Sequence, residues 1–385
     1  MERRDFLRLG SLTAATGLFP RPSAAAVRNE KRGAFRRIVD FTGDGLSLSP
    51  VEYAAELQRL VEQDGFEADY YSQGGAVEAL ERRFAAILGK EKAVFLPTGT
   101  LANHLAVRRL AGKDRRVLVQ AESHFYNDSG DCAGTLSGLT LVPLAQGAAT
   151  FTLDEVESWV RRSARGRVEA SVGVIAIESP VRRRFQEMFG FDEMKKISAF
   201  AREQGIRLHL DGARLFNLPF HSGLTIADYT RLFDTIYVSL WKHFNAASGA
   251  ILAGTAETID GLFHARRMFG GGLPHAWPVM AVALKYADGY LDEYAKAWKI
   301  ASALFAALGE DGRFLVEEIP NGTSVLKLRV HGTSPEAFAG RLKEKSIILS
   351  PARKDDGVFH LMVNTSLNGV DPRALAAAFF DAARA

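Results

Sequence analysis

Two residues with complementary chemistry stand at the ends of two apolar segments of this chain. Lys242 follows the apolar run at residues 235–241, and Asp211 follows a similar run at residues 206–210. A lysine amine can form a Schiff base with an aldehyde, and a buried carboxylate can pair with a protonated pyridine nitrogen. If both runs are neighbouring parallel strands, their carboxyl ends lie at the same edge of a sheet. The pair therefore predicts a site for pyridoxal 5′-phosphate, with Lys242 and Asp211 as catalytic residues.

A phosphate seat is predicted at the Thr-Gly-Thr string of residues 98–100, which stands between a strand-like and a helix-like segment. Backbone N–H groups at a helix N-terminus point toward an anion, and the helix dipole favours negative charge there. An ordinary helix cap has the same sequence, so the string by itself is not specific. The predicted seat comprises Thr98, Gly99 and Thr100, with Ser239 and either Arg266 or Arg267 as further contacts.

Two further polar residues follow predicted strands and extend the candidate site. His124 comes after the apolar segment at residues 117–120, where its ring could stack on a pyridine ring; a half-buried loop histidine is the alternative. Arg214 lies close after Asp211 and could hydrogen-bond the cofactor or a substrate carboxylate. The alternative for Arg214 is an ion pair with Asp211 that closes a turn.

The composition is that of an ordinary globular chain. Of its 385 residues, 47% are hydrophobic and 24% are charged, and the formal net charge is +3. Acidic and basic residues are interspersed without a basic stripe, so we expect no nucleic-acid partner. Cys132 is the only cysteine, which excludes an intramolecular disulfide and a cysteine-based metal cluster.

The first 26 residues resemble a bacterial twin-arginine export signal. Arg3 and Arg4 precede a mildly apolar stretch at residues 10–19, and a small-residue cleavage site follows at residues 23–26. A short basic amphipathic helix is the alternative. No later segment reaches the ~20 apolar residues of a membrane span, so we expect no membrane association. The expected location is the periplasm or beyond, or the cytoplasm if the segment is not a functional signal.

Strand-like and helix-like segments alternate over residues 36–275. Continuous apolar strands, such as residues 172–177, are typical of parallel sheets that are covered on both faces. The pattern predicts an α/β large domain with a mainly parallel sheet. The predicted strands are residues 93–96, 117–120, 140–142, 172–177, 206–210, 235–241 and an antiparallel 249–253, and the main helices are residues 77–88, 101–110 and 191–204.

The pattern changes after the triple glycine at residues 270–272. A long helical region at residues 276–308 is followed by short strands at 324–328 and 358–363 and by a final helix at 372–384. Residues 276–385 are therefore predicted to form a small α+β domain packed on the first.

Five strings together resemble the threonine aldolase and β-eliminating lyase family of fold-type-I pyridoxal phosphate enzymes. They are residues 93–103, 121–126, 209–217, 239–242 and 267–272. The resemblance runs from about Val39 to Tyr286 and is weaker through the C-terminal region.

This resemblance implies a role for each matching residue. Lys242 would be the Schiff-base lysine, Asp211 the pyridine partner and His124 the catalytic stacking histidine. Arg214 would bind the substrate carboxylate or the ring oxygen of the cofactor. Gly99 and Thr100 would bind phosphate, and Arg266 would reach the phosphate of a neighbouring subunit. The protein would then be a homodimer or homotetramer with shared active sites and a small amino-acid substrate.

The departures from the family lie on the substrate side. Gly43 replaces a carboxylate-binding serine, His360 falls where the family has a carboxylate-binding arginine, and Val181 replaces a histidine near the substrate hydroxyl. A histidine offers fewer donors than an arginine and is only partly charged at neutral pH. Arginines that could replace the missing one, or lie solvated on the surface, are Arg182, Arg183, Arg184 and Arg353.

The resemblance implies a lyase that cleaves the Cα–Cβ bond of a β-hydroxy amino acid to glycine and an aldehyde. One alternative is a β-eliminating lyase, with Lys242 or His243 as the base. An aminotransferase on the same cofactor is a second alternative, and a non-catalytic cofactor-binding protein is a third.

Overall fold

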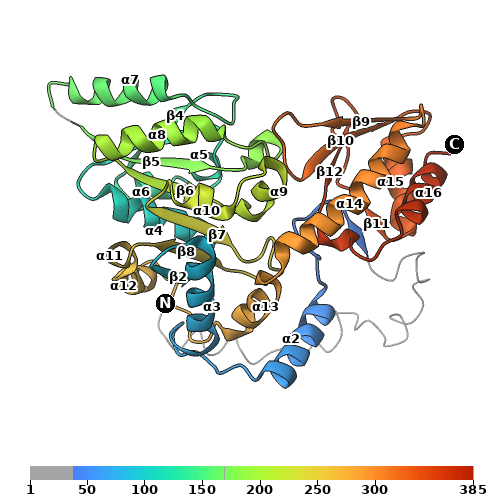
Figure 1. Cartoon of the computed structure of the whole chain (residues 1–385), viewed down its shortest axis with the longest axis horizontal. Coiled ribbons are helices and arrows are strands. Elements are labelled where there is room, and N and C mark those ends of the chain that lie inside the picture. The colour runs from blue at the N-terminus through green and yellow to red at the C-terminus, as the bar shows by residue number, and fades with distance from the viewer. Residues whose placement is uncertain (1–37, 169, 385) are drawn as a thin grey trace, which may run out of the picture.

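The computed structural model describes residues 38–168 and 170–384. The predicted export signal at residues 1–26 lies outside the described residues. Figure 1 shows a large unit built around a sheet and a smaller unit at the C-terminal end, joined by the long helix α14 (Tyr290–Gly309). The predicted α/β class with a smaller C-terminal α+β part is confirmed.

The large unit holds one sheet in the order β2-β8-β7-β6-β5-β3-β4. All strands are parallel except β8, which runs antiparallel to both of its neighbours. The strands are β2 (Lys92–Leu96), β3 (Arg116–Gln120), β4 (Thr140–Leu144), β5 (Val172–Glu178), β6 (Arg207–Asp211), β7 (Thr235–Ser239) and β8 (Ala250–Gly254). The parallel strands place their carboxyl ends at one edge, as the positions of Lys242 and Asp211 require.

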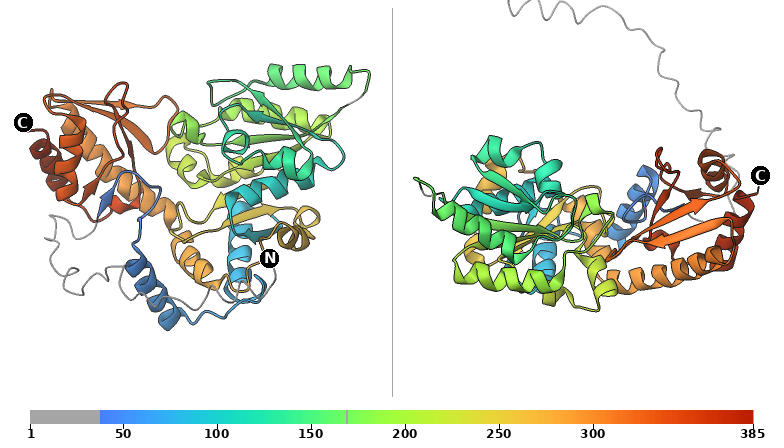
Figure 2. Two further views of the ribbon diagram at one scale, coloured as in Figure 1. Left: turned by 180° about the vertical axis from the view of Figure 1, so that it is seen from behind. Right: turned by 90° about the horizontal axis from the view of Figure 1, so that it is seen from above.

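Both faces of this sheet are buried. In β5, Ile175 and Ile177 belong to one apolar cluster, whereas Val174 and Ala176 belong to another on the opposite face. Successive strand residues point to opposite faces, so a strand covered on both sides must be apolar throughout. Figure 2 shows helices on both faces of the sheet.

The helix α4 (Gly99–Ala111) covers one face through Ala102, Leu105 and Ala106. The helices α3 (Gly75–Leu88) and α8 (Phe191–Glu203) cover the other face. No helix in the described part of the chain is long and apolar enough to cross a membrane. The remaining helices of the large unit are α2 (Pro50–Asp64), α5 (His124–Asn127), α6 (Cys132–Ser137), α7 (Leu153–Ala164), α9 (Leu218–Ser222), α10 (Ile226–Thr230), α11 (Ala256–Ile259), α12 (Leu262–Met268) and α13 (Trp277–Ala287), with 3-10 turns at Arg182–Arg184 and Leu215–Asn217.

The small unit has its own antiparallel sheet, in the order β12-β10-β9. The predicted long helix at 276–308 is two helices, because Gly289 adopts φ 77°, which a continuing α-helix cannot accommodate. The unit contains β9 (Phe314–Glu318), β10 (Val325–Val330), α15 (Pro335–Glu344), β11 (Ile347–Ile348), β12 (Phe359–Met362), a 3-10 turn at Thr365–Leu367 and α16 (Pro372–Ala382).

The hydrophobic cores of the two units do not coincide with the predicted ranges, residues 36–275 and 276–385. The first core continues through α13 to Tyr290 and Tyr294 and therefore ends inside α14. Val39 and Phe41, near the start of the described chain, pack in the core of the small unit. The strand β1 (Val39–Asp40) pairs with β11, so the segment that follows it crosses from the small unit toward the large one.

Asn364 fixes this crossing segment. Its side-chain amide donates to the carbonyls of Asp40 at 2.6 Å and Gly43 at 2.7 Å, and its oxygen accepts from the backbone N–H of Ser366 at 2.8 Å. Asn364 is only 1% exposed, so its own amide is shielded from water and depends on these bonds.

Replacement of Asn364 by alanine should leave the buried carbonyl of Asp40 and the partly buried carbonyl of Gly43 without this donor and lower the free energy of unfolding by roughly 1–3 kcal/mol. Urea unfolding followed by circular dichroism measures the change. The exposed Asn127 is a matched control, because its amide also donates to two carbonyls, of Ala121 and Ser123. Asn127→Ala should cost less than about 1 kcal/mol, since water can take over those bonds. Equal losses in both variants would contradict the assigned role of Asn364.

Candidate active site

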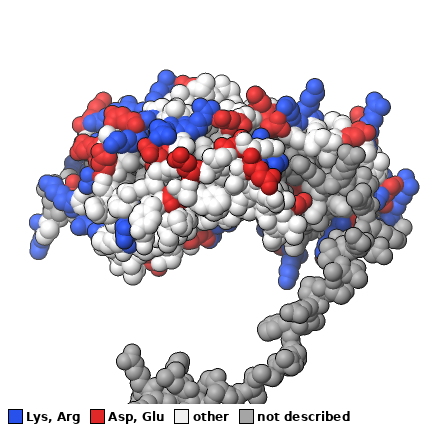
Figure 3. All heavy atoms as spheres, turned by 90° about the horizontal axis from the view of Figure 1, so that it is seen from below, with Lys and Arg blue, Asp and Glu red and all other residues white. Residues whose placement is uncertain are grey.

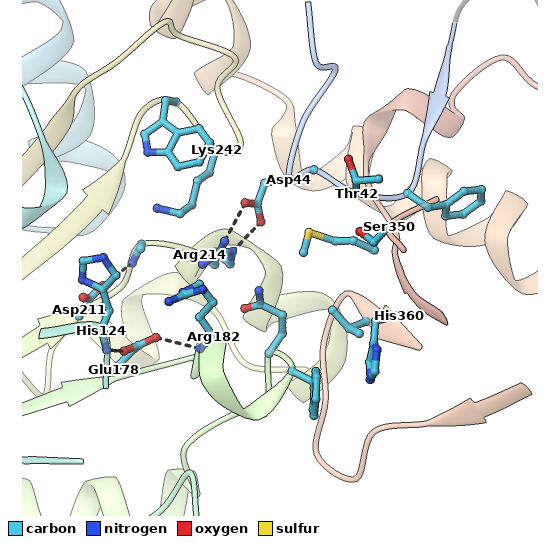
Figure 4. Close-up of a pocket in the computed structure, with 18 of the residues that line it drawn as sticks. Thr42, Asp44, His124, Glu178, Arg182, Asp211, Arg214, Lys242, Ser350 and His360 are labelled. Atoms are coloured by element: carbon cyan, nitrogen blue, oxygen red, sulfur yellow. Dashed lines mark hydrogen bonds and ion pairs between the residues drawn. The ribbon is translucent and has the colours of Figure 1, made fainter. Parts of the chain in front are cut away.

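A cavity of about 570 Å³ lies where the carboxyl edge of the large sheet meets the small unit and the crossing segment. Its lining combines charged residues from the large unit with uncharged ones from the small unit (Figure 4). The lining residues are Phe41, Thr42, Gly43, Asp44, His124, Glu178, Arg182, Phe185, Gln186, Asp211, Ala213, Arg214, Tyr237, Trp241, Lys242, Val325, Ser350, His360 and Met362.

Lys242 follows β7 and extends into this cavity (Figure 4). The residue is 9% exposed, and its Nζ lies 4.8 Å from the centre of the Trp241 ring. Burial, followed by the positive charge of Arg214, lowers the pKa of Lys242 to about 8. About a tenth of the amine is therefore neutral and nucleophilic at pH 7, far more than at the ordinary pKa of 10.5.

Asp211 ends β6 and is held by a chain of buried hydrogen bonds. Asn103 on α4 donates to its Oδ2 at 2.6 Å, and the backbone N–H of Ala213 donates to Oδ1 at 3.1 Å. His209 Nε2 donates to Asn103 Oδ1 at 2.9 Å, while Thr235 lies at 2.8 Å from the other ring nitrogen of His209. Burial lowers the pKa of His209 to about 4, so the ring is neutral and orients the amide. The carboxylate is thus fixed at the cavity wall.

Glu178 ends β5 directly beside Asp211, because the two are register partners in the sheet. Its carboxylate accepts from the backbone N–H groups of His124 at 2.6 Å and Arg182 at 2.9 Å. Burial, and then the negative charge of Asp211, raises the pKa of Glu178 to about 7. This acid can therefore exchange a proton near neutral pH.

His124 begins the short helix α5, which Ser123 caps. Figure 4 shows His124 beside Asp211, on the opposite side of the cavity from His360. Burial lowers the pKa of His124, and the charge of Asp211 offsets part of the effect. A neutral ring at this place can lie against a flat aromatic ligand.

Arg214 forms a buried ion pair with Asp44 from the crossing segment. Its Nε lies 2.6 Å from Oδ1 and its Nη2 2.8 Å from Oδ2, with the two side chains 8% and 6% exposed. Burial alone would raise the pKa of Asp44, but the charge and hydrogen bonds of Arg214 outweigh it, so that pKa is lowered. The partner of Arg214 is thus Asp44, a residue that the sequence did not single out.

The predicted phosphate seat lies beside the cavity. The Thr98 side chain caps α4 by accepting from the N–H of Leu101 at 3.2 Å. Among the described residues, neither the Thr-Gly-Thr string nor Ser239 lines the cavity. Tyr237 does line it, and its hydroxyl packs so closely on Gly99 that a Cβ there would collide with it. Burial, followed by the negative charge of Asp211, raises the pKa of Tyr237, so the phenol stays a donor.

Arg266 is engaged with its own chain. It is 1% exposed and donates to the carbonyls of Phe95 at 2.7 Å and of Tyr71 and Ser72 at 3.3 Å. The neighbouring Arg267 is exposed and lies 4.8 Å from the centre of the Tyr71 ring. A role of Arg266 toward a neighbouring subunit stays a prediction.

The two substituted substrate positions, Gly43 and His360, both line the cavity. A Cβ at Gly43 would lie 3.0 Å from the hydroxyl of Ser47, which leaves little room for a serine. The His360 ring stacks on Phe185 at 4.3 Å and 8°, and its Nε2 has no hydrogen-bond partner among the described residues. Burial, followed by the charge of Arg353, lowers the pKa of His360. This wall of the cavity is therefore aromatic and uncharged.

His243, one of the two candidate bases, faces elsewhere. It lines a separate cavity of about 410 Å³ and stacks on Tyr290 at 4.7 Å. Burial lowers its pKa to about 3. Of the two candidates, Lys242 is the one that the structure places in the cavity of Asp211.

These residues fit pyridoxal phosphate. The cavity offers an amine for the aldehyde, a fixed carboxylate for the pyridine nitrogen, a neutral ring for its face and a nearby helix N-terminus for its phosphate.

No group of histidine, cysteine or acidic side chains in the described ranges could hold a metal ion. Sequence reasoning missed Asn103, Asp44 and Tyr237 as site residues. Of these three, only Asn103 could have been found from the sequence. The helical spacing of residues 101–110 places it on the side of α4 that faces the sheet.

The model of the beta-eliminating lyase family matches residues 57–323, about two thirds of the chain. The chain is 28% identical over 279 residues to the low-specificity L-threonine aldolase of Candida albicans, covering 71% of this chain and 74% of that protein. It is 25% identical over 297 residues to the low specificity L-threonine aldolase of Escherichia coli K12, covering 77% and 87% of the two chains.

A crystal structure from Listeria monocytogenes EGD-E, provisionally described as an L-allo-threonine aldolase, has the same fold. It superimposes with a TM-score of 0.73 at 24% identity and covers 92% of this chain and 97% of that one.

The lowered pKa of Lys242 predicts the pH dependence of cofactor uptake. Only the neutral amine reacts with an aldehyde, so uptake of pyridoxal phosphate by the apo protein should accelerate with pH around a midpoint near 8. The ordinary lysine value of 10.5 would place the midpoint much higher. Stopped-flow visible absorbance measures the rate. Lys242→Ala should show no uptake band, whereas replacing the exposed Lys285 by alanine should leave the profile unchanged. A midpoint near 10 would contradict the buried environment.

Proposed function

Because the chain belongs to the beta-eliminating lyase family, we propose that it is a pyridoxal-phosphate-dependent lyase acting on a β-hydroxy amino acid. The reaction is cleavage of the Cα–Cβ bond to give glycine and an aldehyde. The observation that carries the proposal is the meeting of Lys242 and the fixed Asp211 in one cavity. The names of the Candida albicans and Escherichia coli relatives support threonine-like substrates.

Several residues in and beside the cavity would then bind or orient the cofactor. Pyridoxal phosphate, when bound, supplies an aldehyde that captures amines and a ring that accepts electrons from bonds at Cα. Lys242 holds the aldehyde end, and Asp211 keeps the ring nitrogen protonated. The N-terminus of α4 and the Tyr237 hydroxyl would donate to the phosphate. His124 covers the ring.

Cleavage also requires a group that takes the proton of the substrate hydroxyl. Val181, in place of the family histidine, cannot do so. Lys242 Nζ and the Glu178 carboxylate both line the cavity, and their pKa values are about 8 and about 7. Such values let a group accept and return a proton near neutral pH, which is the requirement for general acid–base catalysis.

The second part of the proposal is that the active unit is a dimer. Thr98 is exposed at the N-terminus of α4, so in one chain the phosphate seat is open on one side. Figure 3 shows a face on which a broad area carries few charged side chains. The exposed Met268 at the end of α12 lies next to α4, since Phe269 and Leu262 pack in the same cluster as Ala102. A second copy of this chain that packs against Met268 and the N-terminus of α4 would close the seat.

The reaction is tested by product analysis of the holo protein with threonine and phenylserine. We expect glycine with acetaldehyde or benzaldehyde. Lys242→Ala should lower kcat at least about 1000-fold, and Asp211→Asn about 100-fold to 1000-fold, because a carboxamide gives the ring nitrogen no charge. Lys285→Ala, an exposed lysine, is the control with unchanged activity.

Other products would select other functions. A 2-oxo acid with ammonia would identify β-elimination, and dependence on an added 2-oxo acid would identify an aminotransferase. Cofactor uptake without any turnover across a panel of amino acids would overturn the proposal in favour of a non-catalytic protein.

The dimer is tested by sedimentation velocity. We expect a mass about twice that of one chain, and we expect Met268→Glu to weaken association at least about tenfold by burying a charge. Leu315→Glu in β9 is the control, because Leu315 is also exposed, at 46%, but belongs to the small unit. A monomer at micromolar concentration, or the same effect in both variants, would contradict this assembly.

A further inference from the structure

We propose that Arg182 binds the carboxylate of the substrate and so replaces the arginine that is missing at His360. The inference rests on the proposed function, since it concerns an amino-acid substrate in the same cavity. The substrate carboxylate would then be bound at the edge of the large sheet and not by the small unit.

Among the arginines of the described lining, only Arg182 can turn toward a substrate anion without breaking a buried ion pair, whereas Arg214 can offer no more than its Nη1 while it stays on Asp44. Among the described lining residues, the cationic side chains are Lys242, Arg214 and Arg182. Lys242 is committed to the cofactor aldehyde. Both Asp44 oxygens already accept from Arg214 in a buried bidentate pair, so turning Arg214 away would leave a buried carboxylate without its counter-charge. Arg182 takes part in no buried ion pair, since its partner Asp128 and its own side chain are both partly exposed.

The opposite wall offers no charge to a carboxylate. Gly43 has no side-chain donor, and His360 is stacked face to face on Phe185. His360 can therefore present at most a neutral N–H, which binds an anion more weakly than a guanidinium fork does. An amino acid bound in this cavity must place its carboxylate elsewhere.

The structure separates Arg182 from the other candidate arginines. Arg183, Arg184 and Arg353 are absent from the lining of the described cavity, whereas Arg182 belongs to it. Arg184 pairs with Glu187, and Arg353 pairs with Asp355 in the small unit.

The backbone holds Arg182 beside the cofactor acids. Its N–H donates to Glu178 Oε1 at 2.9 Å, in the turn that follows β5. Figure 4 shows the Arg182 side chain extending from this anchor into the cavity, on the side of Arg214. The side chain therefore starts from a fixed point at the sheet edge, in the cavity that Lys242 also lines.

Arg182 can leave its present partner at small cost. Its Nη2 bonds to Asp128 Oδ2, and the two side chains are 44% and 23% exposed. Exposed ion pairs of this kind contribute little to stability. Arg183 holds both oxygens of the same carboxylate, at 3.1 Å and 2.8 Å, so Asp128 stays paired when Arg182 turns toward a ligand.

The test compares two ligands that differ by one carboxylate, glycine and methylamine. Both are titrated into the holo protein, and the change in visible absorbance gives the dissociation constant without turnover. Arg182→Met should weaken glycine about 10- to 100-fold, as expected for loss of a charge-assisted contact, and should change methylamine less than about twofold. Arg182→Lys should recover part of the glycine affinity.

Arg183→Met is the matched control, because it removes an equally exposed arginine from the same Asp128. It should leave both dissociation constants within about twofold. Equal weakening of glycine in both arginine variants, or of methylamine and glycine in Arg182→Met, would overturn the assignment. Wild-type protein that takes up the cofactor but responds to methylamine and not to any amino acid would overturn the proposed function itself.

Discussion

The buried carboxylate of Asp211 is the constraint on which the site depends. A charged acid at 6% exposure is costly unless donors or a counter-charge surround it. Glu178, a second acid, lies directly beside Asp211 in the sheet and adds to this cost. Asn103 and the N–H of Ala213 supply fixed donors, and the neutral His209 orients Asn103. Glu178 responds to the crowding by a raised pKa, near 7. A protonated pyridine nitrogen of the proposed cofactor would add a counter-charge to this arrangement.

The Asp44–Arg214 pair determines what remains for the substrate. It connects the crossing segment to the large unit and fixes the Arg214 guanidinium in place, with only its Nη1 outside the pair. Because the pair is buried and bidentate, its geometry is fixed by both units together. The cavity is consequently polar at the sheet edge and aromatic at the small unit, where Phe185 and His360 stack. Because of this division, the proposed carboxylate anchor, Arg182, lies at the sheet edge.

The strands and their ends could be read from the sequence with few errors. The apolar runs before Asp211 and Lys242 are β6 and β7, and the antiparallel run that follows is β8. These assignments succeed because a strand buried on both faces must be apolar along its whole length. The break between α13 and α14 was missed, since Gly289 interrupts an otherwise continuous helical pattern. The short strand β1 pairs with β11 more than 300 residues away, and two residues carry no periodicity.

The sequence by itself determined the kind of fold, the edge of the sheet that carries the chemistry and the amine and acid at that edge. Those features follow from local patterns, because the side-chain period and the alternation of strands with helices are carried by residues close together in the sequence. Tertiary structure alone decided the partners: Asn103 for Asp211, Asp44 for Arg214, Phe185 for His360 and Tyr237 for Gly99. Charge balance and burial depend on atoms brought together from distant segments, and no local pattern encodes their distances.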